Sequence, residues 1–282
     1  MADARELTVD VPAAHGPAAI AAVHAVGVMG VQVRDRGSGA PRGRVHVIAW
    51  LPPTDATAAL AEALAAARTA AAGPSARVTW RDLPVTWDAG PPSRDVGARF
   101  AVVAPGAHAP PGRTPLVLEA ALAFGDGLHP TTALCVEALE ARLGGGAGAI
   151  SVLDVGTGTG ILALVAERLG AAPVVAHDID PLAVWAARRT MAANAARVDV
   201  VEALPDTAFD LVVANLYLAP LRALLPTLAA RVAPAAGGAL LVSGFRADAL
   251  AEVVARAEHA GLTTGAPVER DGWCALLAQR PN

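Results

Sequence analysis

The sequence predicts an α/β protein, in which a mostly parallel sheet covered by helices on both faces follows a small α+β unit. Two observations support this fold class. From about residue 133 onward, helical stretches alternate with short apolar strands, a pattern typical of a parallel sheet with crossover helices. Residues 6–85 instead follow the order strand, helix, strand, strand, helix, strand, which indicates a ferredoxin-like split βαβ unit. At 282 residues, the chain is long enough for two domains.

The first unit is predicted from alternating apolar residues and alanine-rich stretches. Its expected strands are 7–11, 28–35, 44–51 and 78–85, and its expected helices are 17–26 and 54–72. Thr54 provides a side chain that can cap the second helix. We find no phosphate loop or catalytic cluster here, so we interpret the unit as a structural or partner-binding module.

A linker is predicted after the first unit, because a glycine and two prolines in DAGPPSRDV (88–96) continue neither a helix nor a strand. The domains are therefore expected at 1–86 and 99–282, with 87–98 between them. In the second domain, strands are expected at 100–105, 116–120, 150–155, 173–178, 198–202, 209–214, 238–243 and 273–278. Helices are expected at 133–143, 160–169, 181–194, 219–232 and 247–260. Ligands of such sheets bind at the carboxyl ends of the strands.

Composition excludes several classes of function. All 22 basic residues are arginines, so a Schiff-base lysine and a Walker phosphate-binding lysine are both absent. The two cysteines, Cys135 and Cys274, lie far apart without metal-ligand spacing, so no metal site is expected. A net charge of −4 gives no indication of direct nucleic-acid binding. The chain shows neither a membrane-length apolar run nor a signal peptide, and we expect a cytoplasmic protein.

The strongest motif is SVLDVGTGTG at 151–160, an apolar strand ending in Asp154 and followed by three alternating glycines. Glycine lets the backbone approach a ligand closely, and the next helix offers free N–H groups. A nicotinamide fingerprint fails at Ile161 when counted from Gly156, and from Gly158 only the looser form GTGILA fits. An acid just before G-x-G-x-G instead suits a cofactor with a cationic amino-acid end, such as S-adenosylmethionine.

The second motif, HDID at 177–180, closes the next strand. Asp178 lies 20 residues after Gly158, the spacing at which an acid accepts hydrogen bonds from ribose hydroxyls. Asp180 precedes Pro181 and is better placed to cap the following helix. We therefore interpret Asp178 as a ribose ligand.

The third motif, VVANLYL at 212–218, places Asn215 at the end of a later strand of the series, and the fourth is AFGDGLHPTTALCVEALE at 123–140. The amide of Asn215 offers an acceptor and donors that can orient an amine or hold a cofactor, although a turn-forming asparagine is the alternative. Thr132 can cap a helix or reach the cofactor. His129 can be a base, but a loop histidine is more often structural.

Together, the four motifs resemble the ribosomal protein L11 methyltransferase (PrmA) family. The family pattern is FGTGxHxTT, DxGxGSG, DIDP and NxxA, and this chain has FGDGLHPTT, DVGTGTG, DIDP and NLYL in the same order with similar spacing. The resemblance runs from about Leu116 to the C-terminus, including the late GWCALLAQR strand. Two departures are Asp126, in place of the usual threonine, and the lack of a tryptophan-and-basic segment after Trp87.

The resemblance implies a Rossmann-like class I methyltransferase domain and a substrate-recognition role for the first unit. It also implies transfer of methyl groups from S-adenosylmethionine to amines, lysine side chains or an N-terminus, of a ribosomal large-subunit protein. Asn215 is the expected catalytic residue, because it can accept a hydrogen bond from the attacking amine. The expected cofactor-binding residues are Thr132, Gly156, Gly158, Asp178 and Asn215.

Three alternatives remain open at this point. The enzyme can methylate another protein or a small amine instead. The loose GTGILA match leaves an NAD-dependent oxidoreductase possible. The altered loop at Asp126 leaves room for a binding module that has lost activity.

Overall fold

The structure is a computed structural model of the chain. It describes residues 4–16, 18–19, 30–34, 41, 43–51, 77–83, 93–118, 129–145, 150–234 and 237–281. The chain divides into two compact units, Met1–Asp88 and Ala89–Asn282. The predicted helices at 17–26 and 54–72 fall outside the described residues, apart from Ala18 and Ala19, and so does Asp126.

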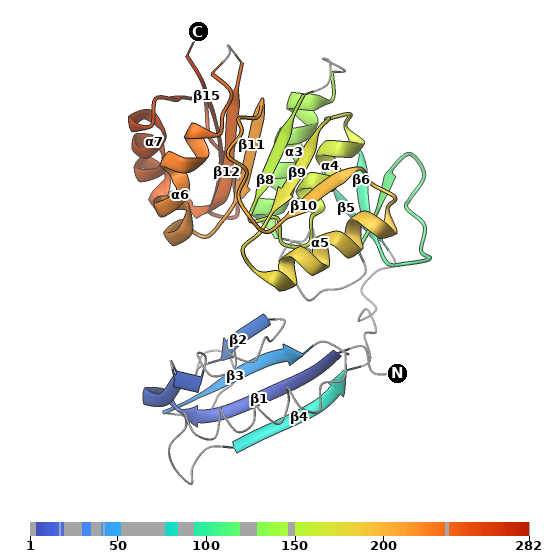
Figure 1. The fold of residues 1–282 in the computed structure, drawn as a ribbon, viewed down its shortest axis with the longest axis vertical. Coiled ribbons are helices and arrows are strands. Elements are labelled where there is room, and N and C mark those ends of the chain that lie inside the picture. Colours follow the sequence, from blue (N-terminus) through green and yellow to red (C-terminus); the bar gives the residue numbers. More distant parts are fainter. Residues whose placement is uncertain are drawn as a thin grey trace. The chain divides into compact units, whose positions relative to one another are not determined.

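The first unit is built on a four-stranded antiparallel sheet with the order β2-β3-β1-β4 (Figure 1). Its strands are β1 (Ala4–Pro12), β2 (Gly30–Arg34), β3 (Arg44–Leu51) and β4 (Arg77–Leu83). In β1, Leu7, Val9 and Val11 alternate with polar residues and are fully buried, because successive side chains of a strand point to opposite faces. All four predicted strands are present, in the order that a ferredoxin-like unit requires.

The second unit contains an eight-stranded sheet with the order β10-β9-β8-β11-β12-β15-β13, and β14 also pairs with β15. The strands are β8 (Val152–Val155), β9 (Val174–His177), β10 (Val198–Val201), β11 (Leu211–Asn215), β12 (Ala239–Arg246), β13 (Thr263–Thr264), β14 (Val268–Arg270) and β15 (Trp273–Gln279). The five neighbouring strands β10, β9, β8, β11 and β12 run parallel to one another, and β15 is antiparallel to β12. The mostly parallel sheet predicted from the sequence is confirmed.

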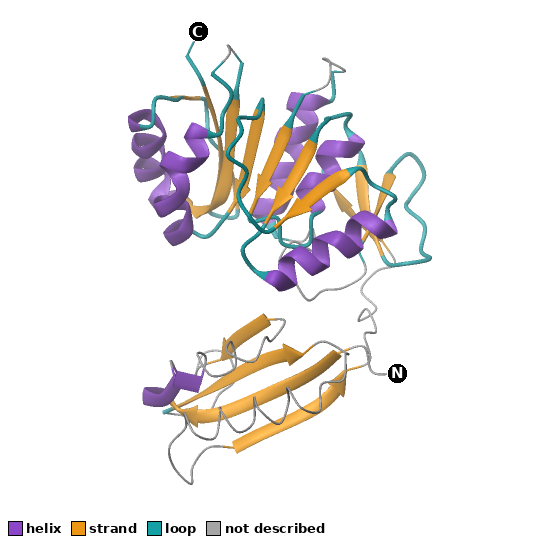
Figure 2. Ribbon diagram, viewed as in Figure 1, coloured by secondary structure: helices purple, strands orange, loops and turns teal. Residues whose placement is uncertain are grey.

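Helices cover both faces of this sheet (Figure 2). They are α3 (Pro130–Leu143), α4 (Ile161–Arg168), α5 (Pro181–Ala193), α6 (Leu218–Ala230) and α7 (Leu250–His259), the last preceded by a 3-10 turn at Ala247–Ala249. α3 contacts α4, which contacts α5, whereas α6 and α7 pack together over a separate apolar core that includes Leu153, Val212 and Leu240.

A smaller sheet of three strands precedes α3. It consists of β5 (Ser93–Val96), β6 (Phe100–Val103) and β7 (Thr114–Val117) in that order. β5 lies inside the segment 87–98 that was predicted to be a linker, so that prediction is wrong for 93–96. Both prolines of the segment lie before Ser93, and from Ser93 onward the backbone is able to pair with β6.

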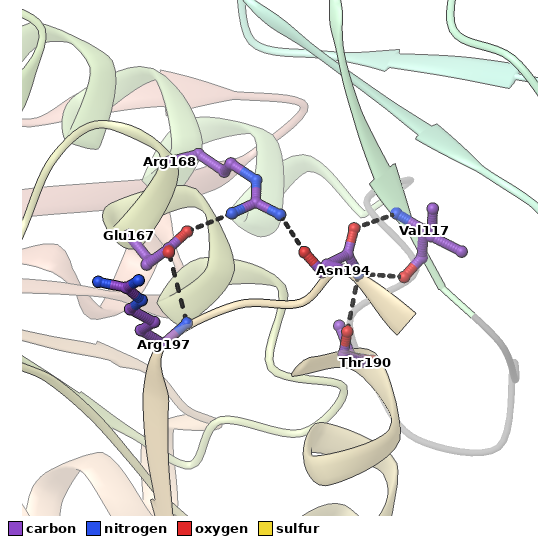
Figure 3. A network of polar contacts seen from close by, with 6 residues as sticks. All are labelled: Val117, Glu167, Arg168, Thr190, Asn194 and Arg197. Atoms are coloured by element: carbon purple, nitrogen blue, oxygen red, sulfur yellow. Dashed lines mark hydrogen bonds and ion pairs between the residues drawn. The ribbon is translucent and has the colours of Figure 1, made fainter. Parts of the chain in front are cut away.

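Asn194, just beyond α5, connects this small sheet to the helices (Figure 3). Its side-chain oxygen accepts from the Val117 backbone N–H at 2.9 Å, and its amide nitrogen donates to the carbonyls of Val117 and Thr190, both at 2.7 Å. Arg168 of α4 donates to the Asn194 carbonyl and pairs with Glu167. The amide of Asn194 thus pairs with β7 as a neighbouring strand residue would.

Candidate functional site

The predicted site residues lie at one edge of the large sheet. Because β8, β9 and β11 run parallel, their carboxyl ends meet at the same edge, and the chain order reverses between β8 and β11. The glycine loop follows β8, Asp178 follows β9, and Asn215 is the last residue of β11. This is the edge at which ligands of open α/β sheets bind.

The glycine loop depends on backbone conformations that only glycine adopts freely. Gly156, Gly158 and Gly160 have φ angles of +73°, +56° and +84°. A Cβ atom on Gly156 would lie 2.2 Å from the Leu216 side chain, and one on Gly160 would lie 2.7 Å from Met191. The glycines therefore allow the loop to turn sharply between β8 and α4 while its neighbours pack against it.

The N–H groups of this loop are bonded within the protein. Gly156 and Thr157 both donate to the His177 carbonyl, at 2.9 and 3.0 Å, and Gly160 donates to Thr157. The sequence analysis expected free N–H groups at the start of the next helix, and there the Ala163 N–H donates to Asp154 at 3.2 Å. A ligand here would contact the backbone surface of the loop and the side chains around it.

Asp154 is a buried acid beneath the loop, with 1% of its surface exposed. Its Oδ2 accepts from the Thr157 hydroxyl at 2.6 Å and from the Ala163 N–H of α4 at 3.2 Å. Its Oδ1 is buried without a hydrogen-bond partner. Burial raises the pKa of Asp154 to about 7, and the hydrogen bonds only partly oppose this. A cation placed above the loop would favour the ionised form.

Asp178 points toward the glycine loop. Its Oδ2 accepts from the Gly158 N–H at 3.0 Å, and its Oδ1 accepts from the Asp180 N–H at 3.0 Å. Each carboxylate oxygen has two lone pairs, so acceptor capacity remains for hydroxyl groups of a ligand. The preceding residue, His177, is buried, and desolvation lowers the pKa of its imidazole, which therefore favours the neutral form.

Asn215 and Thr132 are brought together from segments 83 positions apart. The Asn215 Nδ2 lies 3.5 Å from Thr132 Oγ1, at the start of α3. Thr132 is fully buried, and the Asn215 Oδ1 is also buried and has no hydrogen-bond partner. Since an orphaned acceptor in a protein interior is costly, this oxygen is a candidate for a bond to a ligand N–H.

His129 has a structural position. It caps α3, where its Nδ1 accepts from the Thr131 N–H at 3.4 Å and lies 2.8 Å from the Thr131 hydroxyl. Its ring meets Trp273 of β15 edge-on, with centroids 4.7 Å apart. Of the two roles considered for Thr132, the cap belongs to His129, and Thr132 instead contacts Asn215. Trp273 was not among the predicted site residues, although the GWC segment was part of the family resemblance.

Two absences bear on the chemistry. Among the residues that the structure describes, no group of three or more His, Cys, Asp or Glu side chains is arranged to hold a metal. No described helix is both long and apolar enough to span a bilayer.

Comparison with known proteins now identifies the family. The family model for ribosomal protein L11 methyltransferase (PrmA) matches residues 5–281, nearly the whole chain and both units. The chain belongs to the PrmA family. The resemblance that the four motifs suggested is thus confirmed.

Individual PrmA relatives match most closely over part of the chain. The ribosomal protein L11 methyltransferase of Chromohalobacter salexigens is 43% identical over 196 residues, which is 66% of this chain and 62% of the relative. That of Symbiobacterium thermophilum is 40% identical over 192 residues, with the same shares. The matched region thus spans less than two thirds of the length of these relatives.

Solved structures agree with the fold. The ribosomal protein L11 methylase of Lactobacillus delbrueckii subsp. bulgaricus has a TM-score of 0.61 and 27% identity, covering 67% of this chain and 99% of its own. A T. thermophilus 16S rRNA methyltransferase in complex with AdoMet and guanosine has a TM-score of 0.51 over 98% of this chain and 65% of its own. At 18% identity, this second likeness concerns the fold alone.

Proposed function

We propose that this PrmA-family protein transfers methyl groups from S-adenosylmethionine to amino groups of ribosomal protein L11. The observation that carries the proposal is the meeting of Asp178, the glycine loop and Asn215 at one sheet edge, where Asp178 accepts from the Gly158 N–H at 3.0 Å. The family match and the names of the relatives support this choice of substrate. Since the substrate is a ribosomal protein, we also propose a cytoplasmic location.

The residues at the edge fit S-adenosylmethionine in charge and in hydrogen-bonding capacity. The cofactor has a ribose, for whose hydroxyls Asp178 offers acceptor capacity, and a cationic amino-acid end, for which the buried Asp154 offers negative charge. Gly156 and Gly158 shape the backbone surface against which it would rest. When bound, the cofactor supplies an electrophilic methyl group on a positive sulfur.

The contribution of the protein to transfer would be mainly positioning. A lysine amine has a solution pKa near 10.4, so it must lose a proton before attack, and no described residue stands out as the base. The Asn215 Oδ1 would accept a hydrogen bond from the amine and align its lone pair with the methyl group. Thr132 holds the other end of the Asn215 amide and so fixes which atom faces the substrate. Desolvation of the amine on binding would favour its neutral form.

An NAD-dependent oxidoreductase fits the structure less well. Pyrophosphate binding in a dinucleotide fold uses free N–H groups at the start of the helix. Here the Ala163 N–H, at the last position of the loose fingerprint, donates to Asp154. A negative carboxylate beneath the loop would also repel a pyrophosphate.

The test is methyl transfer to purified L11 with isotopically labelled S-adenosylmethionine, followed by mass spectrometry of the modified peptides. We expect labelled methyl groups on L11 amines and little transfer to free lysine or other small amines. Transfer to a small amine but not to L11 would overturn the substrate. Calorimetric titration with S-adenosylmethionine and with NADH tests the cofactor, and binding of NADH alone would overturn the class of reaction.

A further inference from the structure

The end of β12 carries an arginine that the proposed reaction does not use. Arg246 is exposed, and its guanidinium carbon lies 5.3 Å from the centre of the Trp273 ring. A Cβ atom on Gly272 would lie 2.7 Å from Arg246 Nη2, so the guanidinium lies directly over that glycine. Trp273 in turn meets the edge of His129. The guanidinium of Arg246 thus lies over Trp273, which itself packs against His129 at the start of α3.

A one-residue bulge decides which face of the sheet Arg246 occupies. Ser243 pairs with Ala275 and Phe245 with Cys274, so Gly244 is an extra residue in β12. Gly244 has a φ of +91°, and a Cβ atom on it would collide with the backbone of Leu216. The position therefore has no room for a side chain.

The alternation of side chains is therefore shifted by one. Leu240 and Val242 face the core under α6 and α7, and so does Phe245 after the bulge. Arg246 consequently projects to the opposite face, where Trp273 contacts His129, the N-cap of α3. This is also the face on which Asn215 meets Thr132.

Among the described residues, Arg246 has no anionic partner, in contrast to Arg222 and Arg270. Arg222 donates two hydrogen bonds to the carboxylate of Glu252, and Arg270 donates two to the carboxylate of Glu137. Within the described part of the chain, the guanidinium of Arg246 has neither a hydrogen bond nor an ion pair. The Arg246 guanidinium lies over the Trp273 ring, a contact that uses none of its N–H groups as donors to an anion. The fork of N–H groups of an arginine matches a carboxylate in bidentate geometry.

We propose that Arg246 is a specificity-determining residue that binds a carboxylate of the protein substrate close to the amine being methylated. This inference rests on the function proposed above. The cofactor also has a carboxylate, but its glycine loop follows β8, and β11 with Asn215 lies between β8 and β12. Adjacent strands are about 4.8 Å apart. Along the sheet, the strand order is therefore the glycine loop after β8, then Asn215 at the amine position in β11, then Arg246 in β12.

The experiment measures methyl transfer to purified L11 by the full-length protein and by Arg246→Gln, which keeps a planar polar group over Trp273 but removes the charge. We expect the KM for L11 to rise about tenfold or more, because a charge-assisted hydrogen bond is lost. The dissociation constant for S-adenosylmethionine should change less than about twofold. Arg246→Lys should give an intermediate KM, because a point charge replaces the bidentate fork.

Two controls separate this role from a structural one. Arg256→Gln removes another exposed arginine, which pairs with Glu252 on α7, and it should leave the KM unchanged. Raising the salt concentration should increase the KM of the natural protein and narrow its difference from Arg246→Gln, since salt screens an exposed charge pair.

An unchanged KM in a folded Arg246→Gln protein overturns the inference and leaves the proposed function intact. An unchanged KM with weaker cofactor binding also overturns it, because the carboxylate would then belong to the cofactor. If the natural protein transfers no methyl group to L11, the proposed function itself fails, and the inference fails with it.

Discussion

At the scale of single residues, Asp154 connects the stability of the protein to pH. Its pKa of about 7 in the folded protein exceeds the usual value of 3.8. Between these two values the folded state retains a proton that the unfolded chain has released, so the stability contributed by this group falls as pH rises from about 4 to about 7. Above pH 7 both states are ionised, and the loss is complete.

Asp154→Asn removes this titration while keeping an oxygen for Thr157 and Ala163. We expect the free energy of unfolding of the variant to be close to that of the natural protein near pH 4. It should exceed that of the natural protein at pH 8, where each unit of pKa difference corresponds to about 1.4 kcal/mol. Urea unfolding at several pH values measures this. Parallel pH profiles for the two proteins would show that Asp154 does not titrate in this range.

Asn215→Ala tests the proposed catalytic residue. The variant lacks the acceptor for the substrate amine, so we expect kcat for methyl transfer to fall about 10- to 100-fold, as for loss of one strong hydrogen bond in the transition state. Cofactor affinity, measured by calorimetry, should change much less, because Asp178 and the glycine loop remain. An unchanged kcat would remove Asn215 from the mechanism.

At the scale of elements, the bulge in β12 joins the sheet to the site. A Cβ atom on Gly244 would lie 2.2 Å from the Leu216 carbonyl oxygen, immediately after Asn215. Gly244→Ala should therefore shift Asn215 and lower both stability and kcat. Gly112 is a matched control, because it has a φ of +82° but no atom within 4 Å of its Cβ position.

Gly112→Ala should cost only the left-handed backbone strain, about 1–2 kcal/mol. The difference between the two variants in urea unfolding then isolates the collision with Leu216. Equal destabilisation, with full activity in Gly244→Ala, would mean that the bulge absorbs a side chain without moving the site.

The elements of the large sheet were predictable because their signals are local. Several strands of the series are short apolar runs, such as VLDV of β8 and LVVAN of β11, and the helices between the strands are alanine- and leucine-rich. β13 and β14 have only two and three residues, too few to show a period, and both depend on pairing with β15. β5 was hidden by the prolines directly before it.

The positions of Asp178 and Asn215 at the carboxyl ends of their strands were predictable, because each depends on one residue type at one place in the sequence. Their roles in binding and transfer stay predictions. Contacts between distant segments were not predictable. The pairing of Asn194 with Val117 spans 77 positions, and the face that Arg246 occupies depends on a bulge that no local pattern reveals. The bonding of the loop amides to His177 likewise follows from the pairing of β8 with β9.

At the scale of the whole molecule, we propose that the first unit recognises the substrate and the second unit transfers the methyl group. All the candidate cofactor residues lie in Ala89–Asn282. We expect a protein of residues 89–282 to bind S-adenosylmethionine with nearly the affinity of the full chain but to methylate L11 poorly. Calorimetry and labelled transfer measure these two properties. Full activity on L11 without residues 1–88 would refute the role of the first unit.

Both cysteines of the chain are buried in the second unit, Cys135 in α3 and Cys274 in β15. Cys135 and Cys274 are free and fully buried, and burial raises the pKa of Cys135 to about 12. Because the thiolate is the form that reacts, alkylating reagents should modify neither sulfur until the domain opens. The rate of labelling by iodoacetamide therefore reports how often this domain opens. Adding S-adenosylmethionine should slow the labelling, because a ligand that binds the folded domain makes its opening less favourable.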